Sequence, residues 1–399
     1  MSYIGSSRFA RWAPWALFVA LGLVGGTAAA QSRSVLRELR KLHARAARPD
    51  RVLSDQDARN VHQRLAAWKL DPARLAPDDR RAWFELRISS DLGLGDVTAA
   101  RDALDALRKL APDNPRTWQW TWLVAAAAGD AKLARDAIDH LRKAASDHTA
   151  RRAWSRRLRW IRQVGQDAPD VTIRTEDLTE YDVADRGEQV LVIDFWNTRR
   201  PPPQKTIDAL KRLYEQYRDS PHVAFVGVNA DSESDLNRAR EFARNKGMVW
   251  KQCYEGRSAA APITHKAFQA GRPPWTVVVD SYGFIRAVGS ADEPAFVCAL
   301  RAAIAEARGD AEPVGPRTIR GEQRRAGVAK AAPENRPGGR TRPGDLPSNP
   351  QAASKLRQAR AFLKTGLKSK ARKLLEEIIR DYPGTLEAYK AREYLETIP

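Results

Sequence analysis

Only two residues of this 399-residue chain can supply a thiol, Cys253 and Cys298. A thiolate is the nucleophile of disulfide exchange, which usually needs a C-x-x-C pair so that a second thiol can resolve the mixed disulfide. Cys253 and Cys298 lie too far apart for that pair, which leaves two alternatives: one structural disulfide or two buried, unpaired thiols. Cys253 has no basic cluster beside it, and Cys298 falls within the apolar pattern AFVCALRAAI. Buried, unpaired thiols are the favoured interpretation.

Other catalytic motifs are absent from the sequence. The six histidines are scattered, with none in an H-E-x-x-H spacing, and no serine occupies a G-x-S-x-G turn. The glycines of Gly93–Asp96 (GLGD) stand between predicted helices and not after a strand, so they fit a repeat turn better than a phosphate-binding loop. We therefore expect no metal site and no cofactor.

Apolar strand patterns alternate with amphipathic helical patterns between residues 168 and 306. The predicted strands are APDVTI (168–173), QVLVIDFW (189–196), HVAFVGVNA (222–230), WTVVVD (275–280) and FIRAVG (284–289), and the predicted helices cover 205–219, 232–247 and 293–307. The continuous apolar run at 189–196 is typical of a strand that is buried on both faces of a parallel sheet. These patterns predict an α/β domain.

This region resembles the thioredoxin-like fold, and in particular the exported TlpA/ResA type of thiol–disulfide oxidoreductase. Three motifs carry the resemblance, which covers about a third of the chain. APDVTI is similar to the family's opening strand, VLVIDFWNT to the strand that leads to the active site, and GRPPWTVVVD to a loop in which a cis-proline precedes a strand. By its spacing from Asp280, Pro274 would be that proline, since cis peptide bonds are essentially confined to X–Pro.

The resemblance also implies what the site has lost. In active members a W-x-x-x-C-P-P-C motif follows the strand and opens a helix. Trp196 matches the tryptophan here, whereas Arg200 and Pro203 stand in place of the two cysteines. Neither residue can form a mixed disulfide, and an arginine cation would face the positive end of the helix dipole. Disulfide exchange and peroxide reduction are thus excluded at this site.

For such a scaffold the resemblance implies binding in place of redox chemistry. Thioredoxin-like domains have a shallow groove in which an extended peptide makes backbone hydrogen bonds. Here the groove residues would be Trp196, Arg199, Arg200, Pro274 and Trp275. Arginine beside tryptophan suits a protein or peptide ligand with acidic or aromatic segments. The alternative is a domain kept only as a scaffold, with these tryptophans partly packed.

Two copies of one helical pattern precede this domain. Gly95–Ala111 (GDVTAARDALDALRKLA) and Gly129–Ala145 (GDAKLARDAIDHLRKAA) lie 34 residues apart and are identical at eleven of seventeen positions. The motif resembles the tetratricopeptide repeat, and Gly366–Gly384 is a third copy. Such repeats form a concave peptide-binding face, although an array of two copies could instead dock on the thioredoxin-like domain. Helices are also predicted at 35–46 and 55–68, with Ser34 and Ser54 as their N-caps.

The first thirty residues have the pattern of a secretory signal peptide. Arg8 and Arg11 precede an apolar segment at 15–24, and Ala28–Ala30 fit a cleavage site before Gln31. Because the apolar segment is too short to span a bilayer comfortably, we expect a cleaved signal and a periplasmic or other extracytoplasmic location. An uncleaved N-terminal anchor is the alternative. No later stretch is long enough to predict a transmembrane span.

The expected organisation is a multidomain protein of α and α/β classes. Its segments are a signal peptide (1–30), a helical tetratricopeptide-like domain (31–165), the thioredoxin-like domain (166–308), a disordered linker rich in Pro, Gly and Arg (309–350) and C-terminal tetratricopeptide-like helices (351–399). The first hypothesis for function is an exported protein-binding and assembly protein. The alternatives are an oxidoreductase that acts through Cys253 or Cys298, and an adaptor for an anionic envelope polymer, suggested by the net charge of +19. No specific nucleic-acid-binding motif is present.

Overall fold

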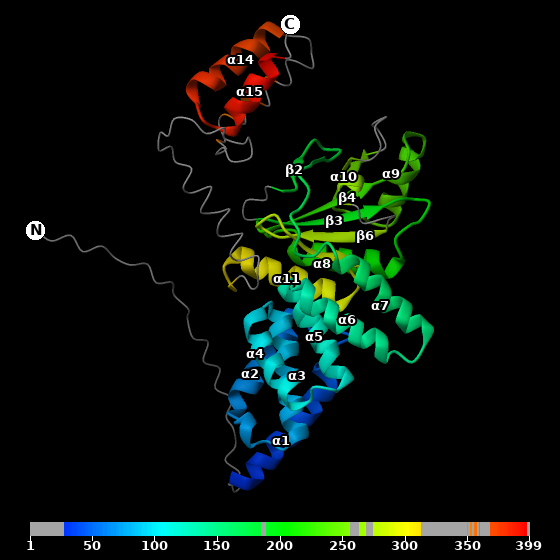
Figure 1. Cartoon of the computed structure of the whole chain (residues 1–399), viewed down its shortest axis with the longest axis vertical. Coiled ribbons are helices and arrows are strands. Elements are labelled where there is room, and N and C mark those ends of the chain that lie inside the picture. The colour runs from blue at the N-terminus through cyan, green and yellow to red at the C-terminus, as the bar shows by residue number, and fades with distance from the viewer. Residues whose placement is uncertain are drawn as a thin grey trace, which may run out of the picture.

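The computed structural model describes residues 28–184, 189–255, 263–268, 274–312, 349, 352, 355–356, 359 and 368–396. The predicted signal segment as far as residue 27 and most of the predicted linker lie outside these residues. Within them the chain forms a helical layer, an α/β domain and a C-terminal helical hairpin (Figure 1).

The N-terminal layer is built from α-helices. They are α1 (Ala28–Ala46), α2 (Asp55–Trp68), α3 (Pro77–Leu94), α4 (Val97–Leu110), α5 (Pro115–Ala128), α6 (Ala131–Ala144) and α7 (His148–Ile161). The two repeat copies are the pairs α3–α4 and α5–α6. Gly95 ends α3 in the left-handed conformation with φ at 81°, and Asp96 then caps α4 by accepting the Ala99 N–H at 3.0 Å. Gly129 and Asp130 do the same between α5 and α6, so the repeated Gly-Asp pair is a helix stop followed by a helix start.

One predicted N-cap is confirmed and one is wrong. Ser54 begins α2, and its Oγ accepts the Asp57 N–H at 3.1 Å. Ser34 is not a cap, because α1 begins at Ala28 and continues through Ser34. The alanines at its start have the highest helix propensity and extend the helix by more than a turn. Helix α7 is not predicted from the sequence, since its arginines obscure the apolar pattern.

The α/β domain has a five-stranded sheet of order β5-β4-β3-β6-β7. Its strands are β3 (Val190–Trp196), β4 (Val223–Asn229), β5 (Lys251–Tyr254), β6 (Trp275–Val279) and β7 (Ile285–Gly289). Strand β3 is parallel to β4 and antiparallel to β6, and every residue of it is buried. This central position explains its continuous apolar sequence, and the predicted thioredoxin-like α/β fold is the one observed.

The predicted opening strand does not join this sheet. Thr172–Arg174 (β1) pairs antiparallel with Glu180–Asp182 (β2) and forms a separate two-stranded ribbon. Ile173 alone of the three β1 residues is buried, and it packs into the core on one face of the main sheet. Of the strand predicted at 168–173, only Thr172 and Ile173 are in β1, and a partner strand a few residues further along the chain takes up its hydrogen bonds.

Helices and the ribbon cover the two faces of the sheet. The helices are α8 (Gln204–Tyr217), α9 (Leu236–Asn245), α10 (Ile263–Ala267) and α11 (Pro294–Arg308). Because successive strand residues point to opposite faces, Val190 and Val192 pack with α8, α9 and α11. Leu191 and Ile193 point the other way, into a core shared with Ile173. The sheet is thus buried on both sides.

Helix α11 lies between the sheet and the helical layer (Figure 1). It contacts β3 and β7 on one side and α3 and α5, the first helices of the two repeats, on the other. The buried Arg286 guanidinium of β7 donates to Glu306 of α11 and to the carbonyl of Ala127 in α5. Arg301 of α11 donates to the carbonyl of Leu53 in the helical layer. Of the two alternatives for the short repeat array, docking on the thioredoxin-like domain is the one observed.

The third repeat copy is also helical. Helices α14 (Lys368–Asp381) and α15 (Leu386–Glu396) pack against each other near the C-terminus. Ala371, Leu375 and Ile378, which occupy the repeat's apolar positions, are fully buried. The copy therefore uses the same small and large apolar residues for packing as the N-terminal pair.

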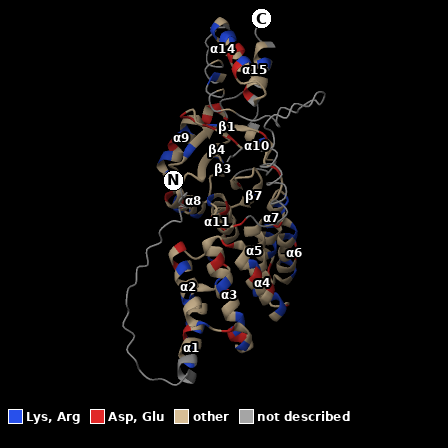
Figure 2. Ribbon diagram, turned by 90° about the vertical axis from the view of Figure 1, so that its left-hand side faces the viewer, with Lys and Arg blue, Asp and Glu red and all other residues tan. Residues whose placement is uncertain are grey.

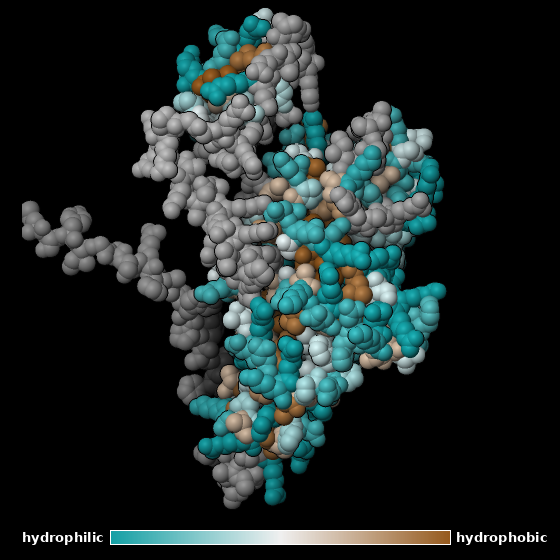
Figure 3. All heavy atoms as spheres, viewed as in Figure 1, coloured by the Kyte–Doolittle hydropathy of each residue, from teal (hydrophilic) through white to brown (hydrophobic). Residues whose placement is uncertain are grey.

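The surface in view in Figure 3 is largely hydrophilic. Among the described residues, the large apolar side chains that are exposed are Leu178 and Val249. None of the helices that the structure describes is both long and apolar enough to cross a membrane.

Candidate functional site

The chain leaves β3 and enters the loop Asn197–Pro203, which we call the Arg-Pro loop. Asp231, just after β4, holds the start of this loop, because its carboxylate oxygens accept the Thr198 N–H at 2.8 and 3.1 Å. Asp231 is buried and accepts a further hydrogen bond from the Asn229 side chain at 2.9 Å. The loop backbone is thus anchored to a buried carboxylate just beyond the neighbouring strand.

Three consecutive prolines delay the start of the next helix. Helix α8 begins only at Gln204, with Pro203 as its N-cap, since a residue that precedes proline is held away from the helical conformation. Arg200 lies in the loop before it, where Asn197 Oδ1 accepts the Arg200 N–H at 2.7 Å. Helix α8 thus begins within one residue of the predicted position 205, and Arg200 lies in the loop that leads to its N-terminus.

The structure brings Arg199, Arg200 and Pro274 to one edge of the sheet. The Arg199 side chain is 75% exposed and forms an ion pair with Asp235 at 3.4 Å. Arg200 is exposed, and no acidic partner for it is found among the described residues. The antiparallel register of β3 with β6 places the half-buried Pro274 beside the end of β3, where the Arg-Pro loop starts. Two cations and a proline therefore border this edge.

The two tryptophans expected in the groove are buried instead. Trp196 is 0% exposed; its Nε1 donates to Gln252 Oε1 at 3.1 Å, and its ring stacks near Phe242. Trp275 is 3% exposed and stacks on Phe195 with ring centroids 4.0 Å apart. Both residues belong to central strands whose faces are covered, so the prediction that Trp196 and Trp275 line a groove is wrong.

Two carboxylates near the loop were not predicted from the sequence. Asp231 anchors the loop, and Asp292, just before α11, fixes the first turn of α8. Lys205 Nζ lies 2.9 Å from Asp292 Oδ2, and Thr206 Oγ1 donates to Asp292 Oδ1 at 2.8 Å. Asp231 could have been predicted from its place directly after a predicted strand. Asp292 could not, because it contacts α8 only once the chain has folded.

Both cysteines are free and buried, as the sequence favoured. Cys253 of β5 is 7% exposed, and Cys298 of α11 is 1% exposed. Burial raises the pKa of each thiol to about 12, and the negative charge of Glu255 also raises the pKa of Cys253. At neutral pH both groups are thiols and not thiolates, which makes them poor nucleophiles.

Asp194 of β3 is a buried carboxyl group that was not predicted as a site residue. Thr276 Oγ1 donates to its Oδ1 at 3.3 Å, and its Oδ2 has no hydrogen-bond partner among the described residues. Burial raises the pKa of Asp194 to about 7, and the hydrogen bond from Thr276 opposes this rise. The group lies two residues before Trp196 and three before the start of the Arg-Pro loop.

We expect Asp194→Asn to flatten the pH dependence of stability. Because the pKa of Asp194 is higher in the folded state than its ordinary value of 3.8, its contribution to stability is fully present below that value and is lost as the pH rises to about 7. At 1.36 kcal/mol per pKa unit the loss is at most about 4 kcal/mol. Denaturant unfolding should be measured for both proteins at about pH 5 and about pH 8. At about pH 8 the free energy of unfolding of Asp194→Asn should exceed that of the wild type. An equal fall in both proteins would contradict this assignment.

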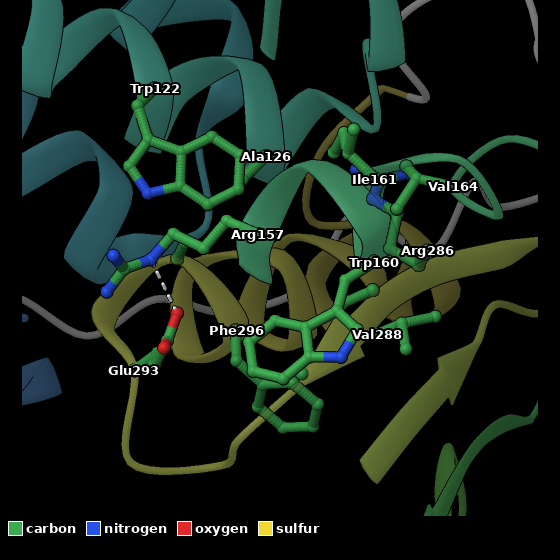
Figure 4. Close-up of a pocket in the computed structure, with 13 residues that line it drawn as sticks. Trp122, Ala126, Arg157, Trp160, Ile161, Val164, Arg286, Val288, Glu293 and Phe296 are labelled. Carbon is green, nitrogen blue, oxygen red and sulfur yellow. Dashed lines mark hydrogen bonds and ion pairs between the residues drawn. The ribbon is translucent and has the colours of Figure 1, made fainter. Parts of the chain in front are cut away.

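A small cavity lies where the helical layer meets the α/β domain (Figure 4). Its walls include Trp122 of α5, Trp160 of α7 and Phe296 of α11. Arg157 and Glu293 also line it and form an ion pair, with 2.9 Å between Nε and Oε2. Its volume of about 30 Å³ holds roughly one water molecule, far less than a small-molecule site needs. No group of three or more His, Cys, Asp or Glu in the described part of the chain could hold a metal ion.

The sheet order, the covering helices and the repeats define a thioredoxin-like α/β domain joined to tetratricopeptide-like helices. Residues 164–288 match the AhpC/TSA family, and residues 353–385 match the tetratricopeptide repeat. The chain is similar to the thioredoxin-like protein YneN of Bacillus subtilis (strain 168), with 25% identity over 125 residues that make up 31% of this chain and 69% of YneN.

Similar solved structures include a thiol-disulfide oxidoreductase from Bacteroides fragilis NCTC 9343, with 20% identity, coverage of 31% of this chain and 90% of that chain, and a TM-score of 0.27. Another is a secreted thiol-disulfide isomerase from Corynebacterium glutamicum, with 23% identity, coverage of 35% and 85%, and a TM-score of 0.28. These similarities cover about a third of this chain.

Proposed function

We propose that this chain is an exported protein-binding and assembly protein of the TlpA/ResA type whose thioredoxin-like domain no longer performs redox chemistry. The observation that carries the proposal is the Arg-Pro loop itself. It presents Arg200 and Pro203, both exposed, where the resemblance places the two cysteines. The thiols of Cys253 and Cys298 are buried elsewhere, each with a pKa of about 12, so they do not replace the missing pair.

The proposed ligand is an extended peptide segment with acidic side chains. Arg199 and Arg200 offer exposed guanidinium groups, which form strong charge-assisted hydrogen bonds with carboxylates. Pro274 borders the same edge of the sheet, beside the end of β3. As a proline it has no backbone N–H to donate to a neighbouring strand. With Trp196 and Trp275 buried, the binding edge consists of the two arginines and the proline, and charge contributes more than aromatic packing.

The repeats support a role in protein interaction and restrict where it occurs. Helix α11 contacts α3 and α5, the helices that line the inner face of the N-terminal pair, so that face is already used within the chain. The Arg-Pro loop and the C-terminal hairpin α14–α15 are among the surfaces left for partners. Export is proposed from the basic, apolar and small-residue pattern of residues 8–30.

The proposal is tested by binding of acidic peptides. Fluorescence anisotropy with Glu-rich peptides that contain one Phe or Tyr should show saturable binding to the wild type. Arg199→Gln/Arg200→Gln should weaken it roughly tenfold, because it removes two solvent-exposed ion pairs that together contribute about 1.4 kcal/mol.

The matched control is Arg212→Gln/Arg244→Gln, which removes the same charge from exposed positions on α8 and α9. It should bind as the wild type does. Equal weakening of both variants would show a general effect of charge and would count against a site at the Arg-Pro loop.

A further inference from the structure

Helix α7 carries an unusual concentration of positive charge. Between His148 and Ile161 it has five arginines and no acidic residue. Arg157 pairs with Glu293, and Arg151 donates to the carbonyl of Ala145. The remaining three guanidinium groups are exposed and have no acidic or hydrogen-bonding partner among the residues that the structure describes. They belong to Arg152, Arg156 and Arg159.

These three arginines lie on one face of the helix. Their spacing of four and three residues places successive side chains one above the other, and together with Ser155 they line an open hollow in the surface. Like charges at these spacings repel each other and destabilise a helix. In the described part of the chain no acidic side chain offsets this repulsion between the three arginines. Unfavourable charge placement of this kind is typical of a functional surface.

The chemistry of this face points to phosphate. Guanidinium groups donate two parallel hydrogen bonds to phosphate or carboxylate oxygens, and α7 has arginine but no lysine. Arg162, exposed just after the helix, extends the row, and ten residues at 1.5 Å each give a length of about 15 Å from Arg152. Such a row of cations fits a chain of anionic groups better than a single anion.

Two other classes of partner fit less well. A protein interface is usually centred on buried aromatic or apolar anchors, and the exposed large apolar residues of the described chain, Leu178 and Val249, are not on α7. A membrane-surface helix inserts its apolar face into lipid, whereas Ile161 of α7 is buried and Trp160 packs near Gly289 of β7. Helix α7 lies beside α6 at the edge of the helical layer, with its arginines in blue in Figure 2.

We propose that the arginine face of α7 binds a linear phosphate-bearing polymer. This function goes beyond peptide binding at the Arg-Pro loop and uses a different part of the chain. Binding is electrostatic, so it releases counterions and weakens steeply as salt rises.

The test uses inorganic polyphosphate as the probe and the full chain as the protein. We expect salt-dependent binding by the wild type. Arg152→Gln/Arg156→Gln/Arg159→Gln should lose at least tenfold in affinity, and the slope of log K against log salt should fall by about 2. Arg37→Gln/Arg59→Gln/Arg64→Gln is the matched control, since it removes three exposed arginines without ion pairs in the described structure from α1 and α2.

Each outcome supports or overturns the proposal. Loss in the α7 variant alone, with neither variant unfolding below the wild-type temperature, supports it. Equal loss in both variants overturns it, because total charge then decides binding. Tighter binding to poly-glutamate or to vesicles containing phosphatidylglycerol than to polyphosphate also overturns it, since the partner would then be an acidic protein or a membrane.

Discussion

Replacing Arg200 and Pro203 by cysteine is expected to convert this chain into a reductant of insulin disulfides. Both positions are exposed in the Arg-Pro loop, and Pro203 caps α8. A thiolate at position 200 would lie beside the Arg199 cation, which lowers the pKa of a thiol. A second cysteine, three residues further on, supplies the thiol that resolves the mixed disulfide.

Insulin reduction driven by dithiothreitol measures this gain. The double-cysteine variant should exceed background by about tenfold or more, since lowering a thiol pKa from 8.5 to 7 raises the thiolate fraction at neutral pH by about that factor. The wild type, Cys253→Ser/Cys298→Ser and Arg200→Ser/Pro203→Ser should all stay at background. Wild-type turnover that disappears in Cys253→Ser/Cys298→Ser would overturn the redox-inactive assignment. A double-cysteine variant that folds but stays inactive would contradict the proposal that the Arg-Pro loop matches the family's active-site motif.

The second large effect, on the free energy of unfolding, is expected where the N-terminal helical layer meets the α/β domain. Arg286 is 1% exposed, and its guanidinium meets both carboxylate oxygens of Glu306, at 2.6 and 3.0 Å, as well as the carbonyl of Ala127. Arg286→Met leaves the buried Glu306 charge without its partner. Removing one member of a buried pair costs about 3–5 kcal/mol of the free energy of unfolding.

Denaturant unfolding of a double-mutant cycle distinguishes the lost pair from lost packing. Arg286→Met/Glu306→Leu should recover most of the stability, because a buried ion pair can be replaced by apolar side chains of similar size. Arg157→Met breaks the Arg157–Glu293 pair across the same junction, where each side chain is 20% exposed, and should cost less than about 1 kcal/mol. If Arg286→Met cost no more than Arg157→Met, the junction would not depend on the buried pair.

These predictions depend on features that differ in how far the sequence reveals them. The buried β3 strand is evident from its apolar run, and the repeat turns are evident from Gly95 and Asp96, which stop one helix and start the next. The absence of a C-x-x-C pair is a property of the sequence alone. Each of these depends on residues that are close together along the chain.

The candidate site was only partly predictable, because several of its contacts join residues that are far apart along the chain. Arg199 and Arg200 lie in a loop, where side chains stay exposed whatever the fold. The burial of Trp196 depends on Phe242 and Gln252, which reach it only when α9 and β5 pack against β3. No local pattern distinguishes a tryptophan at the end of a strand that faces a groove from one that faces a helix.

The sequence by itself determined the type and order of most elements, the charge of the Arg-Pro loop and the absence of thiols from it, because side-chain chemistry and short-range periodicity decide these. Only the tertiary structure decided that α11 fills the inner face of the first two repeats, that Asp231 anchors the loop and that Asp194 is left half-satisfied in the core. Those features arise from contacts between residues distant in sequence, whose burial and partners exist only once the sheet and the helical layer have packed together.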